Sequence, residues 1–410
     1  MKKSSKIIND PLYGFISLKG GIILDLIEHP YFQRLRRISQ LGLTNMVYPG
    51  ANHTRFHHAL GAMHLMNKAI EVLRFKGIEI SDEEADATKI AILLHDIGHG
   101  PFSHALENSI AENVSHEELS IIFMDKLNHE FEGKLTLAIS IFKNQYHKAF
   151  LHQLVSSQLD MDRLDYLNRD SFYSGVQEGI IGAERIINML NVHEGKLVVE
   201  RKGIYSVEKF LIARRLMYWQ VYFHKTVVCA EQILIKALQR AKELSRKNVE
   251  LYSSSSLKIF LNKKVSTSDF INNNDTFTAF TELDDYDIYT ALKEWQHHPD
   301  KILSTLSDSI VNRKLFKVKL ENKALTDSKI SEIRKNIYDK YTLGEEEINY
   351  FFISGKITNS TYKLNDSDIN ILFKDKRVTD LISSADKSTI SALTKNVKKY
   401  FYCLPKDLFI

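Results

Sequence analysis

The clearest hydrophobic pattern in the chain lies just before residue 95. Small and aliphatic residues there repeat at i, i+3, i+4 and i+7, the spacing of one face of an α-helix: Ala87, Ile90, Ala91 and Leu94. Ser81 and Glu84 have the spacing of a capping box at the start of such a helix. Gly98 interrupts the pattern soon afterwards. The pattern therefore predicts a buried helix that ends at residues 95 and 96.

Helical periodicity continues over most of the chain up to about residue 310. It predicts helices over residues 24–40, 56–75, 117–128, 131–143, 149–170 and 207–244, and a short strand over 13–18. Beyond residue 343 the apolar runs become short, which predicts strands at 350–353, 369–373 and 400–403 and a helix at 382–396. The predicted fold class is mainly α, with a helical core over 1–310 and a smaller α+β region over 311–410. We expect the second region to contribute to assembly.

Composition narrows the class of protein without changing this fold. The chain has 410 residues, of which 44% are hydrophobic and 26% charged, as in an ordinary globular protein. The net charge of +4 does not by itself favour nucleic acid as a partner. Cys229 and Cys403 lie far apart in the sequence, which indicates a reducing compartment and no disulfide framework. No apolar run approaches the length of a membrane span, so we expect a cytoplasmic protein that does not bind membranes.

The stretch that follows the predicted helix carries the candidate chemistry. Residues 95–107 contain three histidines and two carboxylates, beginning with the adjacent pair His95 and Asp96. Such a pair is a poor zinc-finger pattern but a good half-site for a divalent metal with mixed nitrogen and oxygen ligands. For the pair alone, a core histidine beside a capping aspartate remains the open alternative. His58 and Asp162 can complete a set of two imidazoles and two carboxylates, which suits Mn²⁺, Mg²⁺, Fe²⁺ or Ni²⁺.

Two polar stripes accompany this set. One runs along the predicted helix 149–170 and contains Asp162, Tyr166, and Arg169 or Asp170. The other runs along the predicted helix 207–244 at i, i+4, i+8 and i+11, and its cationic and aromatic residues suit phosphates and a stacked base: Arg214, Tyr218, Tyr222 and Lys225. For each stripe, a solvated or snorkelling helix face remains the alternative.

Seven short motifs then occur in one order between residues 6 and 320. They are Ile8-Asn9-Asp10-Pro11, Gln33-Arg34-Leu35-Arg36, Gln40-Leu41-Gly42, Tyr48-Pro49-Gly50-Ala51, Arg55-Phe56-His57-His58-Ala59-Leu60-Gly61, the run from His95 to His104, and Met161-Asp162-Arg163-Leu164-Asp165-Tyr166. The ordered set resembles the HD-domain deoxynucleoside triphosphate triphosphohydrolases related to the human sterile-alpha-motif and HD-domain enzyme. The resemblance implies an HD-domain helical core and hydrolysis of a deoxynucleoside triphosphate (dNTP) to deoxynucleoside and inorganic triphosphate, with dGTP the favoured substrate.

The resemblance also implies roles for individual residues. It implies one divalent metal (Mn, Mg or Fe, with Ni as a further candidate) on His58, His95, Asp96 and Asp162, and an additional Mg²⁺ that arrives with the nucleotide. It assigns proton handling to His99, His104, Glu107 and His116. It assigns substrate contacts to Gln40, Leu41, Arg55, Arg163, Tyr166, Asp170, Arg214, Tyr222 and Lys225. The chain departs from the family pattern at Glu107, where the family has Asp, and at His57, where it has Glu.

A second nucleotide site is a weaker implication of the same resemblance. It would bind dGTP, GTP or another dNTP as an effector between subunits, through Lys6, Ile7, Asn9, Glu28, Gln33, Arg36, Arg313 and Lys317. The implied assembly is a homo-oligomer, with a tetramer arranged as a dimer of dimers favoured. Three alternatives stay open: another HD nucleotide phosphatase, a phosphodiesterase, or a non-catalytic module that binds nucleotide or single-stranded nucleic acid. An exposed helix face is the alternative for the effector residues.

Overall fold

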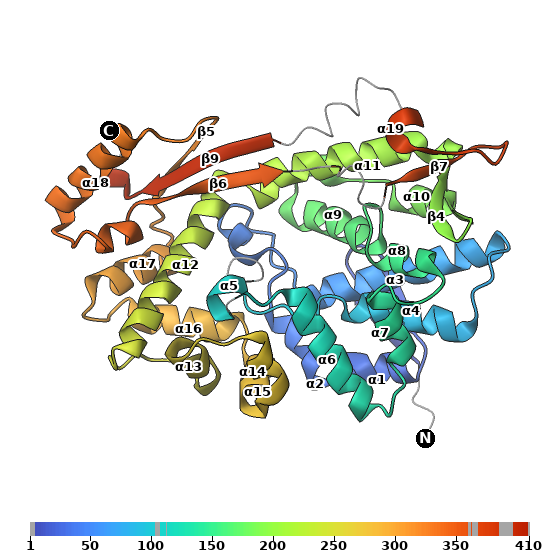
Figure 1. Ribbon diagram of the computed structural model, residues 1–410, viewed down its shortest axis with the longest axis horizontal. Coiled ribbons are helices and arrows are strands. Elements are labelled where there is room, and N and C mark those ends of the chain that lie inside the picture. Colours follow the sequence, from blue (N-terminus) through green and yellow to red (C-terminus); the bar gives the residue numbers. More distant parts are fainter. Residues whose placement is uncertain are drawn as a thin grey trace.

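The computed structural model describes residues 5–102, 107–111, 113–359, 362, 368–384 and 397–408. The chain is mainly helical with small sheets, as predicted (Figure 1). The helices up to residue 189 are α1 (Ile22–Glu28), α2 (Pro30–Gln33), α3 (Arg55–Phe75), α4 (Asp82–Leu94), α5 (Glu107–Ile110), α6 (His116–Glu130), α7 (Thr136–Phe142), α8 (Ala149–Val155), α9 (Met161–Ser174) and α10 (Ala183–Met189). Single 3₁₀ turns, η1 (Arg34–Arg37) and η2 (Gly42–Met46), lie between α2 and α3.

The second half adds a further group of helices and most of the strands. The helices are α11 (Ile204–Met217), α12 (Lys225–Arg246), α13 (Ser255–Asn262), α14 (Thr267–Asn272), α15 (Asn274–Glu282), α16 (Asp285–Trp295), α17 (Lys301–Val311), α18 (Asp327–Tyr341) and α19 (Leu381–Ser384). The strands of the chain are β1 (Lys6–Asp10), β2 (Gly14–Leu18), β3 (Leu190–His193), β4 (Lys196–Glu200), β5 (Lys317–Glu321), β6 (Ile353–Asn359), β7 (Asn370–Leu372), β8 (Val378–Asp380) and β9 (Val397–Leu404).

Helices α3 and α4 form where the hydrophobic pattern predicts them. In α4 the predicted capping box is present, because the Ser81 side chain accepts from Glu84 N and the Glu84 carboxylate accepts from Ser81 N. Its apolar stripe is buried from Ala87 to Leu94, against α3 and α7. The helix ends at His95, so the two candidate ligands follow directly on a rigid buried element.

Three of the predicted helices are each divided. The one predicted over 24–40 is divided into α1, α2 and the 3₁₀ turn η1. The predicted helix 149–170 is wrong as a single element, because α8 ends at Val155 and α9 begins at Met161. Asp160 caps α9, since its carboxylate accepts from Arg163 N. The predicted helix 207–244 is also wrong as a single element. A π-helical turn over Tyr218–Tyr222 follows α11, and His224 caps the new helix α12. The last two breaks face the large cavity described below, since residues of each break line it.

The C-terminal strands join two different sheets. β9 lies between β5 and β6 in an antiparallel sheet, whereas β7 and β8 extend the β3–β4 hairpin through a parallel β4–β7 pairing. Figure 1 shows the β5–β9–β6 sheet along one edge of the helical body, beside α12. The strand predicted at 350–353 is displaced, because a 3₁₀ turn occupies Glu347–Tyr350 and β6 begins at Ile353. Of the helix predicted at 382–396, residues 385–396 lie outside the described part.

A fully buried arginine fixes the turn that follows the candidate ligands. The Arg34 guanidinium lies between the rings of Phe123 and Phe280, 5.4 and 5.1 Å from their centroids. It donates to His99 O at 2.8 Å and to Ile97 O at 3.1 Å, so it satisfies backbone carbonyls that the end of α4 leaves free. Burial lowers the pKa of Arg34 to about 9, which still leaves the side chain charged at neutral pH.

Gly98 lets α6 approach this turn closely. Its backbone N donates to Ser120 Oγ at 3.0 Å, and Ser120 Oγ in turn donates to His95 O at 2.7 Å. A Cβ at residue 98 would overlap the backbone atoms of Ser120 and His116. The close contact places His116, the first residue of α6, beside the turn that carries His99.

No helix within the described ranges combines the length and the apolar composition needed to cross a lipid bilayer.

Gly98→Ala should destabilise the protein, because the added methyl group meets backbone atoms of α6 that cannot move without shifting the helix. Overpacking of this kind typically costs about 1–3 kcal/mol, and chemical denaturation would measure it. Gly182→Ala is the matched control, since a Cβ there meets only the Arg185 Cβ at 3.8 Å. Equal stability of the two variants would contradict the close packing of α6 on the turn.

Candidate metal centre and active site

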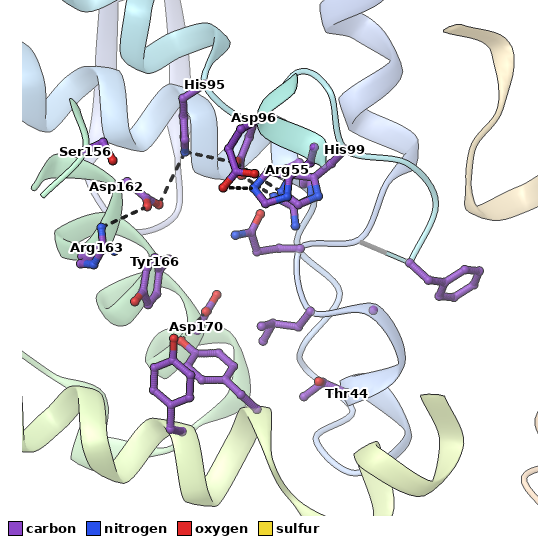
Figure 2. Close-up of a pocket in the computed structure, with 18 of the residues that line it drawn as sticks. Thr44, Arg55, His95, Asp96, His99, Ser156, Asp162, Arg163, Tyr166 and Asp170 are labelled. Atoms are coloured by element: carbon purple, nitrogen blue, oxygen red, sulfur yellow. Dashed lines mark hydrogen bonds and ion pairs between the residues drawn. The ribbon is translucent and has the colours of Figure 1, made fainter. Parts of the chain in front are cut away.

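Three helices bring the four predicted ligands together. His58 lies in the first turn of α3, His95 and Asp96 follow α4, and Asp162 lies in the first turn of α9. Asp162 Oδ1 is 3.1 Å from His58 Nε2 and 3.6 Å from His95 Nε2. The carboxylate of Asp96 lies 3.3 Å from His95 Nε2 and 3.8 Å from His58 Nε2. Figure 2 shows His95, Asp96 and Asp162 turned toward one another at one end of the pocket.

Internal hydrogen bonds fix which imidazole nitrogen is available in each histidine. His58 Nδ1 donates to the Asp165 carboxylate at 2.8 Å, and His95 Nδ1 donates to Ile92 O at 2.6 Å. Because these acceptors carry no hydrogen to donate, Nδ1 must be the protonated nitrogen in each ring. Both Nε2 atoms are buried and have no hydrogen-bond partner in the described part of the chain. In their neutral form, the two imidazoles can therefore direct their lone pairs at one point beside Asp162.

The charges around this point favour a cation. Burial alone would lower the pKa of His58, but the carboxylates of Asp162 and Asp165 outweigh burial and raise it to about 10. Burial opposes ionisation of Asp162 as well, but His58 and His95 hold its pKa far below the usual range. The carboxylates thus concentrate negative charge at the site, and a bound cation would balance it. Two imidazole nitrogens and two carboxylates fit a divalent metal that takes mixed ligands, and neighbouring ligands of an octahedral ion with bonds of about 2.1 Å lie about 3 Å apart.

A buried chain of charges behind His58 holds it in place. Asp165 accepts from His58 Nδ1 and also from Arg169 Nε and Nη2, at 2.9 and 3.0 Å. Arg169 Nη1 donates to Asp10 at the end of β1, at 2.9 Å, so the chain reaches the N-terminal hairpin. All four side chains are almost fully buried. A partner of this kind orients a ligating histidine and increases its basicity.

Sequence reasoning did not assign this supporting role to Asp165 and Arg169. Asp165 lies three residues after Asp162, and the i, i+4 spacing of Asp165 and Arg169 is typical of an ion pair along a helix. That spacing is the signal from which the pair could have been predicted. The partnership with Asp10 has no local signal, because it joins residues 159 positions apart.

Asp96 has a second partner besides the ligand cluster. Arg55 Nη1 donates to Asp96 Oδ2, and both side chains are buried. Burial would raise the pKa of Asp96, but His95 and Arg55 keep it well below the usual range. Arg55 thus lies at the metal site with a guanidinium that faces the cavity, where it can also meet an anionic ligand.

His99 and His116 form a stacked pair beside the ligand cluster. Their ring centroids are 3.9 Å apart with an interplanar angle of 16°, and His99 Nε2 lies 3.4 Å from Asp96 Oδ1. Burial and the neighbouring Arg55 hold the pKa of His99 well below the usual range, so the ring is neutral. Although Asp96, His99 and His116 could be taken for a second metal site, nearly parallel stacked rings cannot both direct an in-plane lone pair at one ion. The pair suits proton transfer instead.

The other two residues assigned to proton handling are not placed. His104 lies outside the described residues, and Glu107 is the first residue of α5 with its side chain outside them. Their roles stay predictions.

A cavity of about 600 Å³ opens from the ligand cluster toward η2 and α12. Most of the residues that the sequence assigned to substrate line it: Gln40, Leu41, Arg55, Arg163, Tyr166, Asp170 and Tyr222. Figure 2 shows Asp170 and Thr44 away from His95, toward the other side of the pocket. The volume and the mixture of aromatic and polar lining residues suit a nucleotide-sized ligand.

Two of the assigned residues are not among those that line the cavity. Arg214 is buried, with its guanidinium 5.9 Å from the ring centroid of Tyr218, which does line it. Lys225 is exposed at the first residue of α12. The break between α11 and α12 separates these two residues from the stripe that a single helix would have formed.

The cavity also has lining residues that the sequence reasoning missed. They are Gly42, Thr44, Phe102, Glu117, Phe142, His152, Val155, Ser156, Phe223 and Glu231. Phe102, Ser156 and Phe223 lie outside the α-helices, where periodicity gives no direction for a side chain. Asp285 is not a lining residue but holds two segments of the wall together. Its carboxylate accepts from Ser39 N and from Phe102 N, both at 2.8 Å. Asp170 is held by His53 Nε2 and by the Tyr222 hydroxyl, each at 2.7 Å.

The residues assigned to an effector lie on the surface or make local contacts. Lys6 pairs with Glu28 at 2.7 Å, and Ile7 and Asn9 are exposed on β1. Gln33 donates to Ile27 O and accepts from Arg36 Nε, while the Arg36 guanidinium lies 3.5 Å from the Phe56 ring centroid. Arg313 donates to Met46 O at 2.8 Å, and Lys317 begins β5. None of these contacts tests an effector site, which stays a prediction.

Comparison with known proteins adds family information to this geometry. The HD domain family model matches residues 55–170, which contain all four ligands, and the HD associated region model matches residues 181–273. YwfO of Bacillus subtilis is 35% identical over 319 residues, covering 76% of this chain and 71% of YwfO. A deoxynucleoside triphosphate triphosphohydrolase SAMHD1 homolog of Dictyostelium discoideum is 33% identical over 261 residues, covering 59% of this chain. The match spans 50% of that relative's length.

Solved structures agree with the fold. The crystal structure of a phosphohydrolase from Bacteroides thetaiotaomicron has a TM-score of 0.94 and 52% identity, and the match covers 98% of this chain and 99% of that one. A hypothetical protein from Aquifex aeolicus has a TM-score of 0.74 and 28% identity, with 99% and 98% of the two chains covered.

Binding of a divalent metal should stabilise the folded protein. At a hundred times its dissociation constant, an ion that binds only the native state adds about 2.7 kcal/mol. Mn²⁺ should therefore raise the Tm of the wild-type protein in a thermal-shift assay and EDTA should reverse the rise. The variant that carries both His95→Ala and Asp96→Ala should show no such response. An equal rise in both proteins would place the metal elsewhere.

Asp165→Asn should weaken metal binding without touching a ligand. The amide removes the charge that holds the His58 Nδ1–H, and loss of such a partner typically costs about 10–100-fold in metal affinity. Calorimetric titration with Mn²⁺ measures the change. Asp86→Asn is the matched control on α4, because Asp86 is exposed and its ion pair, with Lys89, is away from the ligand cluster. Unchanged affinity in the Asp165 variant would remove this residue from the support of the site.

Proposed function

The chain belongs to the HD-domain family of metal-dependent phosphohydrolases, and from that premise we propose that it hydrolyses dNTPs to deoxynucleoside and inorganic triphosphate. The observation that carries the proposal is the pair of His58 and His95 Nε2 atoms, buried without a hydrogen-bond partner within the described residues, at one end of a nucleotide-sized cavity. The 33% identity to a Dictyostelium protein named as a dNTP triphosphohydrolase supports the choice of substrate class.

The two ends of the cavity match the two ends of such a substrate. Arg55 and Arg163 line it near the ligand cluster, where their guanidiniums can clamp phosphate oxygens. The Arg163 Nε is buried without a hydrogen-bond partner in the described part of the chain, so it has a donor left for an anion. Further along, Tyr166, Asp170 and Tyr222 offer a hydrogen-bonding and aromatic surface for the sugar.

The reaction cleaves the bond between the first phosphorus and the 5′ oxygen of the sugar. His58, His95, Asp96 and Asp162 would hold the divalent ion, which supplies Lewis acidity that neutralises phosphate charge and makes water more acidic. Neutral His99 and the His116 ring stacked on it lie beside the ligand cluster, where they can take up the proton of the attacking water and pass it onward. The 5′ oxygen leaves with a proton, and the three phosphates leave together.

We extend the proposal to regulation by nucleotide in an oligomer. Arg36, one of the residues assigned to an effector, lies over the ring of Phe56, and Phe56 stands between Arg55 and the ligand His58 in the first turn of α3. A ligand that draws Arg36 away would therefore release a contact at the base of the metal site. This arrangement supports coupling between a second site and catalysis.

Product analysis tests the proposed reaction. The purified protein with Mn²⁺ or Mg²⁺ should release deoxynucleoside and tripolyphosphate from a dNTP, as resolved by ion-exchange chromatography. The variant with His95→Ala and Asp96→Ala should fall to background, whereas Asp86→Asn should keep full activity. Pyrophosphate or orthophosphate as the first product would overturn the assignment in favour of another HD phosphatase. Turnover of cyclic nucleotides instead would indicate a phosphodiesterase.

Nucleotide pairs extend the same assay to the regulation. If an effector is required, a mixture of two dNTPs should be hydrolysed faster than either alone, and size-exclusion chromatography should show assembly on addition of the activating nucleotide. Additive rates and an unchanged oligomeric state would remove the effector. Metal-independent binding of single-stranded nucleic acid without any hydrolysis would favour a binding module instead.

A further inference from the structure

Glu231 is a carboxyl group in the cavity that the proposed reaction does not use. It lies on α12, in the second turn after the π-helical break, and lines the cavity with Gly42 and Phe102. A Cβ built on Gly42 would be 3.9 Å from Glu231 Oε1 and 3.5 Å from Phe102 O, so these three residues surround one small region. Within the described ranges Glu231 makes no hydrogen bond and no ion pair. This partly buried carboxyl group therefore has no partner within the part of the chain that the structure describes.

Burial disfavours the ionised form of an unpaired carboxyl group and so raises its pKa. Desolvation raises the pKa of Glu231 to about 7, and no other charge contributes to the shift. A helix residue with a purely structural role could be apolar at this position, because neighbouring α12 residues such as Cys229 and Ala230 are fully buried. An unsatisfied acceptor that faces a ligand cavity indicates a donor on the ligand.

The position of Glu231 in the cavity indicates which part of the substrate it would contact. The metal ligands and Arg55 occupy one side of the cavity, and the Asp170–Tyr222 pair lies between that side and α12. Gly42 and Thr44 of η2 line the cavity next to α12, and Figure 2 shows Thr44 far across the pocket from His95. With phosphates at the metal and the sugar at Asp170, the base reaches the end of the cavity where η2 meets α12. Phe223 also lines the cavity and provides apolar surface for one face of the base.

We propose that Glu231 determines base specificity by accepting two hydrogen bonds from the Watson–Crick edge of guanine. A carboxylate has two acceptor oxygens and no donor. Guanine presents two adjacent donors, N1–H and the 2-amino group, whereas adenine and cytosine present a donor beside an acceptor. Thymine presents one donor between two acceptors, which would repel the carboxylate. The inference rests on the proposed dNTP hydrolysis and adds to it the base that this site favours.

Two comparisons test this assignment: dGTP with dITP as substrates, and the wild-type protein with Glu231→Gln. dITP differs from dGTP only by lacking the 2-amino group, and Glu231→Gln keeps the shape of the side chain while replacing one acceptor by a donor. The wild-type protein should hydrolyse dGTP with a kcat/KM about 10-fold or more above that for dITP, as expected for one well-placed base contact. In Glu231→Gln this ratio should fall to near one, and the ratio of dGTP to dATP should fall about 10–100-fold. Glu243→Gln, an exposed change on the same helix, should leave both ratios unchanged.

The outcomes separate the two proposals. If wild-type protein and Glu231→Gln hydrolyse dGTP, dITP and dATP in the same ratios, Glu231 does not read the base, although dNTP hydrolysis stands. If the wild-type protein releases triphosphate from no dNTP, the proposed reaction fails. Calorimetric titration of the wild-type protein with dGTP and dITP then decides the inference: tighter binding of dGTP supports it and equal affinities overturn it. Should Glu231→Gln unfold, the wild-type comparison of dGTP with dITP decides alone, with equal kcat/KM as the contrary result.

Discussion

Two imidazole rings with their Nδ1–H groups already committed are the constraint on which the rest of this structure depends. His58 donates to Asp165 and His95 donates to a backbone carbonyl, so neither ring can turn to satisfy its other nitrogen. Both Nε2 atoms are left buried beside Asp162. An arrangement that leaves polar atoms unsatisfied costs stability unless a ligand completes it. The packing of α3, α4 and α9 maintains that unsatisfied arrangement.

The surrounding fold converts this constraint into a site. Arg34 binds the carbonyls of the turn after α4, and Ser120 joins that turn to α6, so His99 and His116 are held beside Asp96. On the other side, the two helix breaks open the space that a continuous helix would have filled. The break after α8 exposes Ser156 to the cavity, and the break before α12 exposes Phe223. The chemistry and the space for a substrate thus depend on different elements.

The sequence was sufficient for the parts of the fold that are locally encoded. The capping box at Ser81 and the apolar stripe of α4 follow from spacing alone, and the four candidate ligands, which the fold brings together, follow from their side-chain chemistry together with the family resemblance. Helical periodicity did not reveal the break at Tyr218, because a π-helical turn shifts the register without removing the apolar residues. The parallel pairing of β4 with β7 joins segments about 170 residues apart, which no local pattern encodes. Glu231 was missed because an isolated carboxylate on an amphipathic helix is typical of a solvated face.

One measurement tests the account at its centre. Crystals grown with Mn²⁺ should give an anomalous difference peak within coordination distance of His58 Nε2, His95 Nε2 and the carboxylates of Asp96 and Asp162. A peak at that point, with the two Nδ1 hydrogen bonds unchanged, is the predicted result. A fully occupied manganese ion at another place in the cavity, with the two Nε2 atoms still unligated, would contradict the account.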